Sequence, residues 1–183
     1  MPTWRPNFNP DHLYFVTTKA VDYTHLFQRD IVKRLLVDSL DCLRLRQWFT
    51  LYAFVIMPNH IHLIIQYAAE RPLETIIRDF KKHVTDRLRR QYQLEMNQKA
   101  LEFLASKAAG KQKYKVWETG YQAKDIFSPD FLHQKLTYLH NNPCQPHWQL
   151  AERPEDYIWS SAPFYLTEQA ALIPVTDVRP LMV

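Results

Sequence analysis

The stretch Met57-Pro58-Asn59-His60-Ile61-His62-Leu63-Ile64-Ile65 decides the fold, because it places turn residues directly before an apolar strand that carries two histidines. Side chains alternate between the faces of a strand, so His60 and His62 leave the sheet on the same side. Ile61, Leu63 and Ile65 point to the other side, which is typical of a buried face. Two imidazoles at this spacing can bind one divalent metal if the chain supplies a third ligand. Two surface histidines that are hydrogen-bonded to their neighbours also fit the pattern.

The segments on either side of this stretch predict an α+β sandwich. The sequence predicts, in order, a strand at 12–18, a helix at 29–48, a strand at 49–57, the histidine strand, a helix from 72 to about 88, a strand at 114–117 and a helix at 128–141. This order matches a ferredoxin-like antiparallel sheet with helices on one face. Residues 49–57 are apolar on both faces, which indicates a central strand. The second face, with the histidines, would be accessible to a large substrate.

The length of 183 residues predicts a single domain over residues 1–183. We expect its core at about 12–142 and a helical extension at about 92–113. Residues 143–183 are rich in proline and predict an irregular C-terminal tail with short helical pieces.

Composition excludes several classes of protein. The chain has two glycines, which excludes the glycine-rich phosphate loops of most nucleotide-dependent enzymes. Its two cysteines cannot build a disulfide scaffold or a four-cysteine zinc site. No segment is long and apolar enough for a membrane span or a secretion signal, so we expect a cytoplasmic protein with no membrane partner. The net charge of +4 permits a nucleic-acid partner.

A second group of candidate catalytic and metal-binding residues lies in and directly after the predicted helix at 128–141. Ser128 and Pro129 form a helix start, and Tyr138 and Asn142 are four residues apart, so they share one face. A tyrosine hydroxyl can act as a covalent nucleophile, and an amide oxygen can bind a hard cation. A packed tyrosine and a helix-terminal asparagine are the ordinary alternatives.

Basic and aromatic residues suggest where a nucleic acid would bind. We expect contacts to the phosphate backbone from the basic second helix and from the segment that follows the extension, and base stacking from two aromatic residues there. The candidates are Arg78, Lys81, Lys82, Lys115, Trp117 and Tyr121. A solvated helix face and two core aromatics fit the same pattern.

The histidine motif after Met-Pro-Asn resembles that of the single-tyrosine HUH transposases of bacterial insertion sequences. Residues 116–121, Val-Trp-Glu-Thr-Gly-Tyr, are similar to their Trp-x-x-Gly-Tyr segment. Residues 138–143, Tyr-Leu-His-Asn-Asn-Pro, and 156–161, Asp-Tyr-Ile-Trp-Ser-Ser, resemble the REP-associated tyrosine transposases. The insertion-sequence branch usually has glutamine in place of Asn142, which favours the REP-associated branch.

The resemblance implies the transposase HUH fold and a specific reaction. His60, His62 and Asn142 would bind Mg²⁺ or Mn²⁺, and Tyr138 would attack a phosphate of single-stranded or hairpin DNA, such as a REP-like palindrome. The products would be a 5′-phosphotyrosine link and a free 3′-hydroxyl, which can be rejoined. The insertion-sequence branch works as homodimers and the REP-associated branch as monomers, so either state is compatible with the sequence.

Two other functions remain open at this stage. A ferredoxin-like sheet with aromatic residues and a basic helix is also typical of non-catalytic nucleic-acid-binding modules. A metal-dependent phosphoesterase for small substrates is the third possibility, although few carboxylates accompany the histidines.

Overall fold

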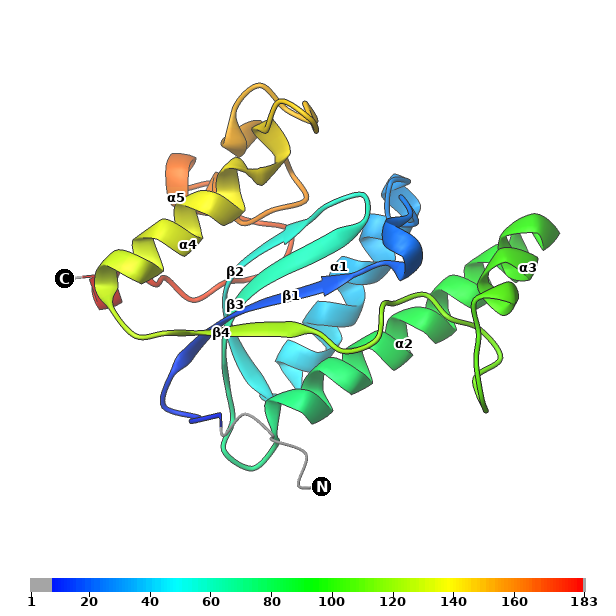
Figure 1. Ribbon diagram of the computed structural model, residues 1–183. Coiled ribbons are helices and arrows are strands. Elements are labelled where there is room, and N and C mark those ends of the chain that lie inside the picture. Colours follow the sequence, from blue (N-terminus) through cyan, green and yellow to red (C-terminus); the bar gives the residue numbers. More distant parts are fainter. Residues whose placement is uncertain (1–7, 183) are drawn as a thin grey trace.

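The structure is a computed structural model, and it describes residues 8–182. Its centre is a four-stranded antiparallel sheet with the order β2-β3-β1-β4 (Figure 1). The strands are β1 (Leu13–Lys19), β2 (Phe49–Ile56), β3 (His60–Tyr67) and β4 (Gln122–Ile126). The predicted histidine strand is thus a central strand, paired on both sides.

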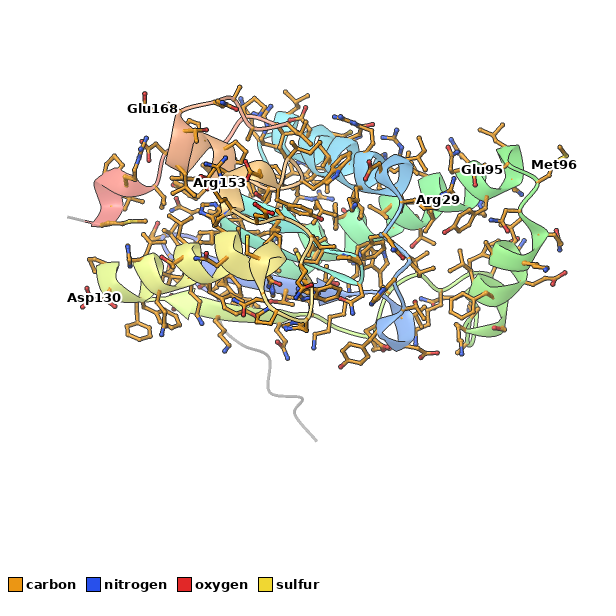
Figure 2. The ribbon with its side chains drawn as sticks, turned by 90° about the horizontal axis from the view of Figure 1, so that it is seen from above. Arg29, Glu95, Met96, Asp130, Arg153 and Glu168 are labelled. Carbon is orange, nitrogen blue, oxygen red and sulfur yellow. The ribbon has the colours of Figure 1, made fainter. Side chains whose placement is uncertain are left out.

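Helices lie on both sides of this sheet. The longer ones are α1 (Asp30–Leu45), α2 (Leu73–Leu94), α3 (Gln98–Ser106), α4 (Pro129–Asn141) and α5 (Ala162–Thr167). Short 3-10 helices are η1 (Val21–Tyr23), η2 (Asn142–Cys144), η3 (Pro154–Asp156) and η4 (Arg179–Met182). Helices α1 and α2 cover one face, and α4 crosses part of the other face (Figures 1 and 2). The α+β class and the antiparallel sheet are confirmed, with α4 as an addition on the face expected to be accessible.

The β2–β3 hairpin follows from its local sequence. Pro58 and Asn59 make the turn, which the amide of Met57 closes by donating to the His60 carbonyl at 2.8 Å. The alternation of β3 then buries Ile61 and Leu63 at 2% exposure or less. Burial of such side chains contributes about 1.5–3 kcal/mol each, so a one-residue shift in register would be costly. The hydrophobic pattern therefore determines which face carries the histidines.

The predicted strand at 114–117 is wrong. In this segment, Trp117 makes a single isolated bridge to Ala20 and packs its indole against Phe27 and Phe80 at 4.9 and 5.8 Å between ring centres. The fourth strand is instead β4, in which Ile126 is the one buried residue of the range Gln122–Ile126. Because β4 is a polar edge strand, it lacks the apolar alternation that would have indicated it.

Strand β2 was expected to be central, but it lies at the sheet edge. The C-terminal segment covers that edge. The amide of Ile56 donates to the Trp159 carbonyl and the amide of Ser161 donates to the Phe54 carbonyl, both at 2.9 Å. This cover, together with helices on both faces, explains why an edge strand is apolar on both sides.

The extension that the sequence predicted at 92–113 contains the end of α2 and the helix α3. Arg29 and Glu95 form a bidentate ion pair with both contacts at 2.7 Å, and they point toward each other in Figure 2. Asn97 caps α3 by accepting the Ala100 amide at 3.1 Å. Within residues 8–182, no helix is long and apolar enough to cross a membrane.

Candidate active site

His60 and His62 leave β3 on the same face, as predicted, with their ring centres 4.7 Å apart. Thr17 lies directly opposite His62 in β1, and its Oγ1 is 2.7 Å from His62 Nδ1. The second nitrogen of this ring, Nε2, is buried and has no hydrogen-bond partner among residues 8–182. A buried polar atom without a partner is costly in a folded protein, so this nitrogen needs a ligand or water.

The orientation of His60 is determined by the residue before it. The side-chain Nδ2 of Asn59 donates to the Tyr23 carbonyl at 3.2 Å. This contact turns Asn59 Oδ1 toward His60 Nδ1, at a distance of 2.6 Å. An amide oxygen can only accept, so His60 Nδ1 carries the proton and Nε2 has a free lone pair. Both histidines are therefore held by their Nδ1 atoms, the arrangement usual for imidazoles that ligate a metal through Nε2.

Burial keeps both imidazoles neutral. It lowers the pKa of His60 to about 4, with smaller contributions from the charges of Lys19 and His147. Burial also lowers the pKa of His62 well below its ordinary value, helped by His60 and by two lysines. A neutral imidazole is the form that binds a metal, so the pair is competent as ligands at pH 7.

Helix α4 brings Tyr138 to the histidines. Ser128 caps the helix by accepting the Phe131 amide at 3.2 Å, and an apolar side of three leucines holds it in place. Tyr138 is 48% exposed, and its ring centre lies 5.5 Å from that of His62. Asn142, four residues later, is buried and lines the same cleft. The structure thus brings together the four residues that the sequence selected for catalysis and metal binding.

The cleft around these residues has a volume of about 810 Å³ and is positively charged. Three lysines line it, and no Asp or Glu occurs among the described residues of its lining. Lys135, one turn before Tyr138, has its Nζ 5.8 Å from the tyrosine ring centre. Burial and the nearby Lys124 lower the pKa of Lys135. This cleft would attract an anion such as a phosphodiester.

Sequence reasoning missed several residues of this cleft. The i, i+3 spacing of Lys135 and Tyr138 could have identified the lysine. Thr17 depends on the register between β1 and β3, and the role of Asn59 depends on its contact with Tyr23. Neither relationship has a signal in the sequence.

The six predicted nucleic-acid-binding residues line a different cleft, of about 1100 Å³, between α2 and residues 111–121. Lys81 has a structural role, because its Nζ donates hydrogen bonds to the carbonyls of Glu118 and Gly120. Burial lowers the pKa of Lys81 to about 8. Arg78, Lys82 and Lys115 are exposed or half-buried, and Arg78 Nε lies 3.4 Å from Asp79 Oδ1.

The two aromatic candidates in this cleft differ. Trp117 is 5% exposed, and its Nε1 donates to the Lys81 carbonyl at 3.1 Å. The expectation that Trp117 stacks on bases is therefore corrected: its indole packs in the core and fixes the 111–121 segment. Tyr121 is half-buried, and burial raises its pKa to about 12.

A comparison with known families identifies the chain. The family model for IS200-like transposases matches residues 11–141, a range that includes both histidines and Tyr138. The chain belongs to this family. No group of three or more His, Cys, Asp or Glu side chains in the described part of this IS200-like transposase could hold a metal. Asn142, which lines the same cleft as the histidine pair, is outside these four residue types.

A solved structure confirms the fold of this IS200-like transposase. It is similar to a REP-associated tyrosine transposase bound to a REP hairpin, with a TM-score of 0.65 and 14% identity over 97% of this chain and 93% of the other. A Deinococcus radiodurans protein that carries a provisional transposase name has a TM-score of 0.46 and 19% identity over 77% of this chain and 97% of its own. No curated protein matches the chain significantly.

Proposed function

We propose that this IS200-like transposase is a metal-dependent DNA endonuclease and strand transferase with Tyr138 as its nucleophile. The main support is that Tyr138 and the histidine pair share one cleft. The exposed phenol ring lies 5.5 Å from the His62 ring, whose Nε2 has no hydrogen-bond partner within residues 8–182. A hydroxyl beside neutral, oriented imidazoles suits covalent attack on a phosphate.

The donor set fits a divalent ion, Mg²⁺ or Mn²⁺. His60 and His62 would each offer Nε2, and Asn142 would offer its side-chain oxygen, a set that combines imidazole with a hard ligand. When bound, the ion would polarise the scissile phosphate as a Lewis acid. Thr17 and Asn59 would keep the two rings in their binding orientation.

Tyr138 would carry the covalent step. Its phenol oxygen would form a bond to phosphorus while the bond from phosphorus to the 3′-oxygen breaks. The phenol proton would leave and the 3′-oxygen would gain a proton, so that a 5′-phosphotyrosine link and a 3′-hydroxyl result. Attack by another 3′-hydroxyl would reverse the step and join strands. Lys135 would stabilise the negative charge near the phenol oxygen.

The substrate that we propose is single-stranded or hairpin DNA, including REP-like palindromes. The structurally similar REP-associated transposase is bound to a REP hairpin. In this chain, a lysine-lined cleft at the histidines and a basic cleft beside α2 could bind a cleaved strand and a hairpin stem. Because Tyr138 lies beside the histidines of its own chain, we propose that one protomer can form a complete site, whether the protein is a monomer or a homodimer.

A covalent-adduct assay tests the proposal. The protein is incubated with Mn²⁺ and hairpin oligonucleotides that carry single-stranded extensions, and products are separated under denaturing conditions. We expect an adduct that depends on Mn²⁺ and is absent in Tyr138→Phe. An undiminished adduct in that variant would reject Tyr138 as nucleophile. Hairpin binding that survives EDTA and His60→Ala, with no cleavage at all, would instead support a non-catalytic module.

A further inference from the structure

We propose that Trp148 and Tyr23 form a binding site for an unpaired nucleobase next to the scissile phosphate. This inference rests on the proposed function of the cleft and specifies how the cleft would hold its substrate. Both side chains line the cleft that contains the histidine pair and Tyr138.

The position of Trp148 is fixed by the loop that follows η2. Its amide donates to the Gln145 carbonyl at 2.8 Å, and the amide of Leu150 donates to the Pro143 carbonyl at 2.9 Å. The half-buried indole has its centre 5.9 Å from the His60 ring. A nucleotide whose phosphate lies at the histidines would therefore have a base within reach of Trp148.

Tyr23 is held in an uncommon conformation at the rim of the same cleft. It has a φ of 55°, in the left-handed region that bulky residues rarely adopt, and the residue is 58% exposed. Its amide donates to the Ala20 carbonyl at 3.1 Å, and its carbonyl accepts from Asn59. Such conformations persist where the surroundings impose them, often at binding sites. These backbone contacts do not involve the aromatic ring.

Charge around the two rings fits a nucleotide. Lys19 Nζ lies 4.8 Å from the Tyr23 ring centre, and Lys124 and Lys135 also line the cleft. Among the described lining residues, acidic side chains are absent. Lysines neutralise phosphates and aromatic rings stack on unpaired bases, so this combination matches single-stranded DNA.

Binding measured without cleavage tests the site. The Tyr138→Phe protein in EDTA is titrated against fluorescein-labelled hairpins whose single-stranded extension has one abasic position, moved along the strand in turn. We expect one position at which loss of the base weakens binding by about 5- to 150-fold. In the Trp148→Ala protein, binding of the intact strand should weaken by a similar factor, and the abasic penalty at that position should disappear.

Three further variants complete the design. Trp148→Phe keeps an aromatic ring and should retain most of the affinity. Tyr23→Asn removes the ring but tolerates the left-handed conformation, and should weaken binding less than Trp148→Ala. Leu166→Ala removes an exposed apolar side chain of α5 outside the cleft and should change nothing. Thermal melting of each variant checks the fold, and Tyr23→Asn still tests the site if Trp148→Ala does not fold.

The outcomes separate this inference from the proposed function. If the abasic penalty is the same in all variants, or if no position shows a penalty, the base site is rejected whether or not Tyr138 forms an adduct. If no adduct forms with Mn²⁺ but the penalty depends on Trp148, the base site stands and the proposed chemistry fails.

Discussion

Thr17 and His62 face each other across two adjacent strands, with Thr17 Oγ1 2.7 Å from His62 Nδ1 in a buried setting. The contact leaves the other ring nitrogen of His62 free for a ligand. The orientation of the His62 ring therefore depends on a hydroxyl of the neighbouring strand.

Thr17→Val tests this contact with a change that conserves shape. It leaves His62 Nδ1 without its buried partner, so we expect a loss of about 1–3 kcal/mol in the free energy of unfolding, measured by urea denaturation. Calorimetric titration should show that Mn²⁺ affinity falls about 10- to 100-fold. Unchanged Mn²⁺ affinity would mean that Thr17 does not position His62 for a metal.

His140 gives a prediction for pH. It is 4% exposed, its Nε2 lies 2.9 Å from Ser161 Oγ, and burial lowers its pKa to about 4. Between pH 4 and 6.5 the unfolded state binds more protons at this residue, so stability present above pH 6.5 is lost as the pH falls toward 4. Protonation of His140 should lower the free energy of unfolding by on the order of 3 kcal/mol over this pH range.

The matched variant is His140→Gln, which can keep a hydrogen bond to Ser161 but does not titrate. Urea denaturation at pH 7, 6, 5 and 4 should show a shallower decline for the variant than for the unchanged protein. Parallel stability curves would show that His140 is not buried as a neutral group.

Lys135→Met tests the charge beside Tyr138. If Lys135 stabilises the negative charge that develops there, the rate of adduct formation should fall roughly tenfold or more. Lys99→Met is the control, because Lys99 is exposed on α3 and lines neither cleft. Equal rates in the two variants would remove Lys135 from the proposed reaction.

The basic cleft beside α2 predicts a salt-dependent effect. Lys82→Ala and Lys115→Ala should each weaken hairpin binding, and each should reduce the slope of log affinity against log salt by about 1 for every phosphate that the lysine neutralises. The measurement is anisotropy at several salt concentrations, with Lys99→Ala as the control for charge. Slopes equal to that of the control would show that the stem binds elsewhere.

The sequence predicted best those elements whose signals are local. The alternation around His60 and His62 indicated both their shared face and the buried side of β3. Ser128 and Pro129 identified the start of α4, and the i, i+4 spacing placed Tyr138 near Asn142. Each of these relationships depends on residues within one element, where periodicity is informative.

Relationships between distant segments were not predictable. β4 has a polar sequence, and only its pairing with β1 makes it a strand. The sequence does not show which of Trp117 and Trp148 is buried. Tertiary packing buries Trp117 and leaves Trp148 in the cleft. The partners of the histidines, Thr17 and Asn59, likewise depend on register and on a backbone contact.

The segment around Trp159 and Ser161 also covers the β2 edge of the sheet, which hinders self-association. Its hydrogen bonds occupy amides and carbonyls of β2 that an extended strand of another molecule could otherwise pair with. At the opposite edge, β4 is exposed and carries charged side chains, which discourages pairing. Proteolytic removal of the segment that contains Trp159 and Ser161 would thus expose an apolar sheet edge, through which molecules could polymerise by strand pairing.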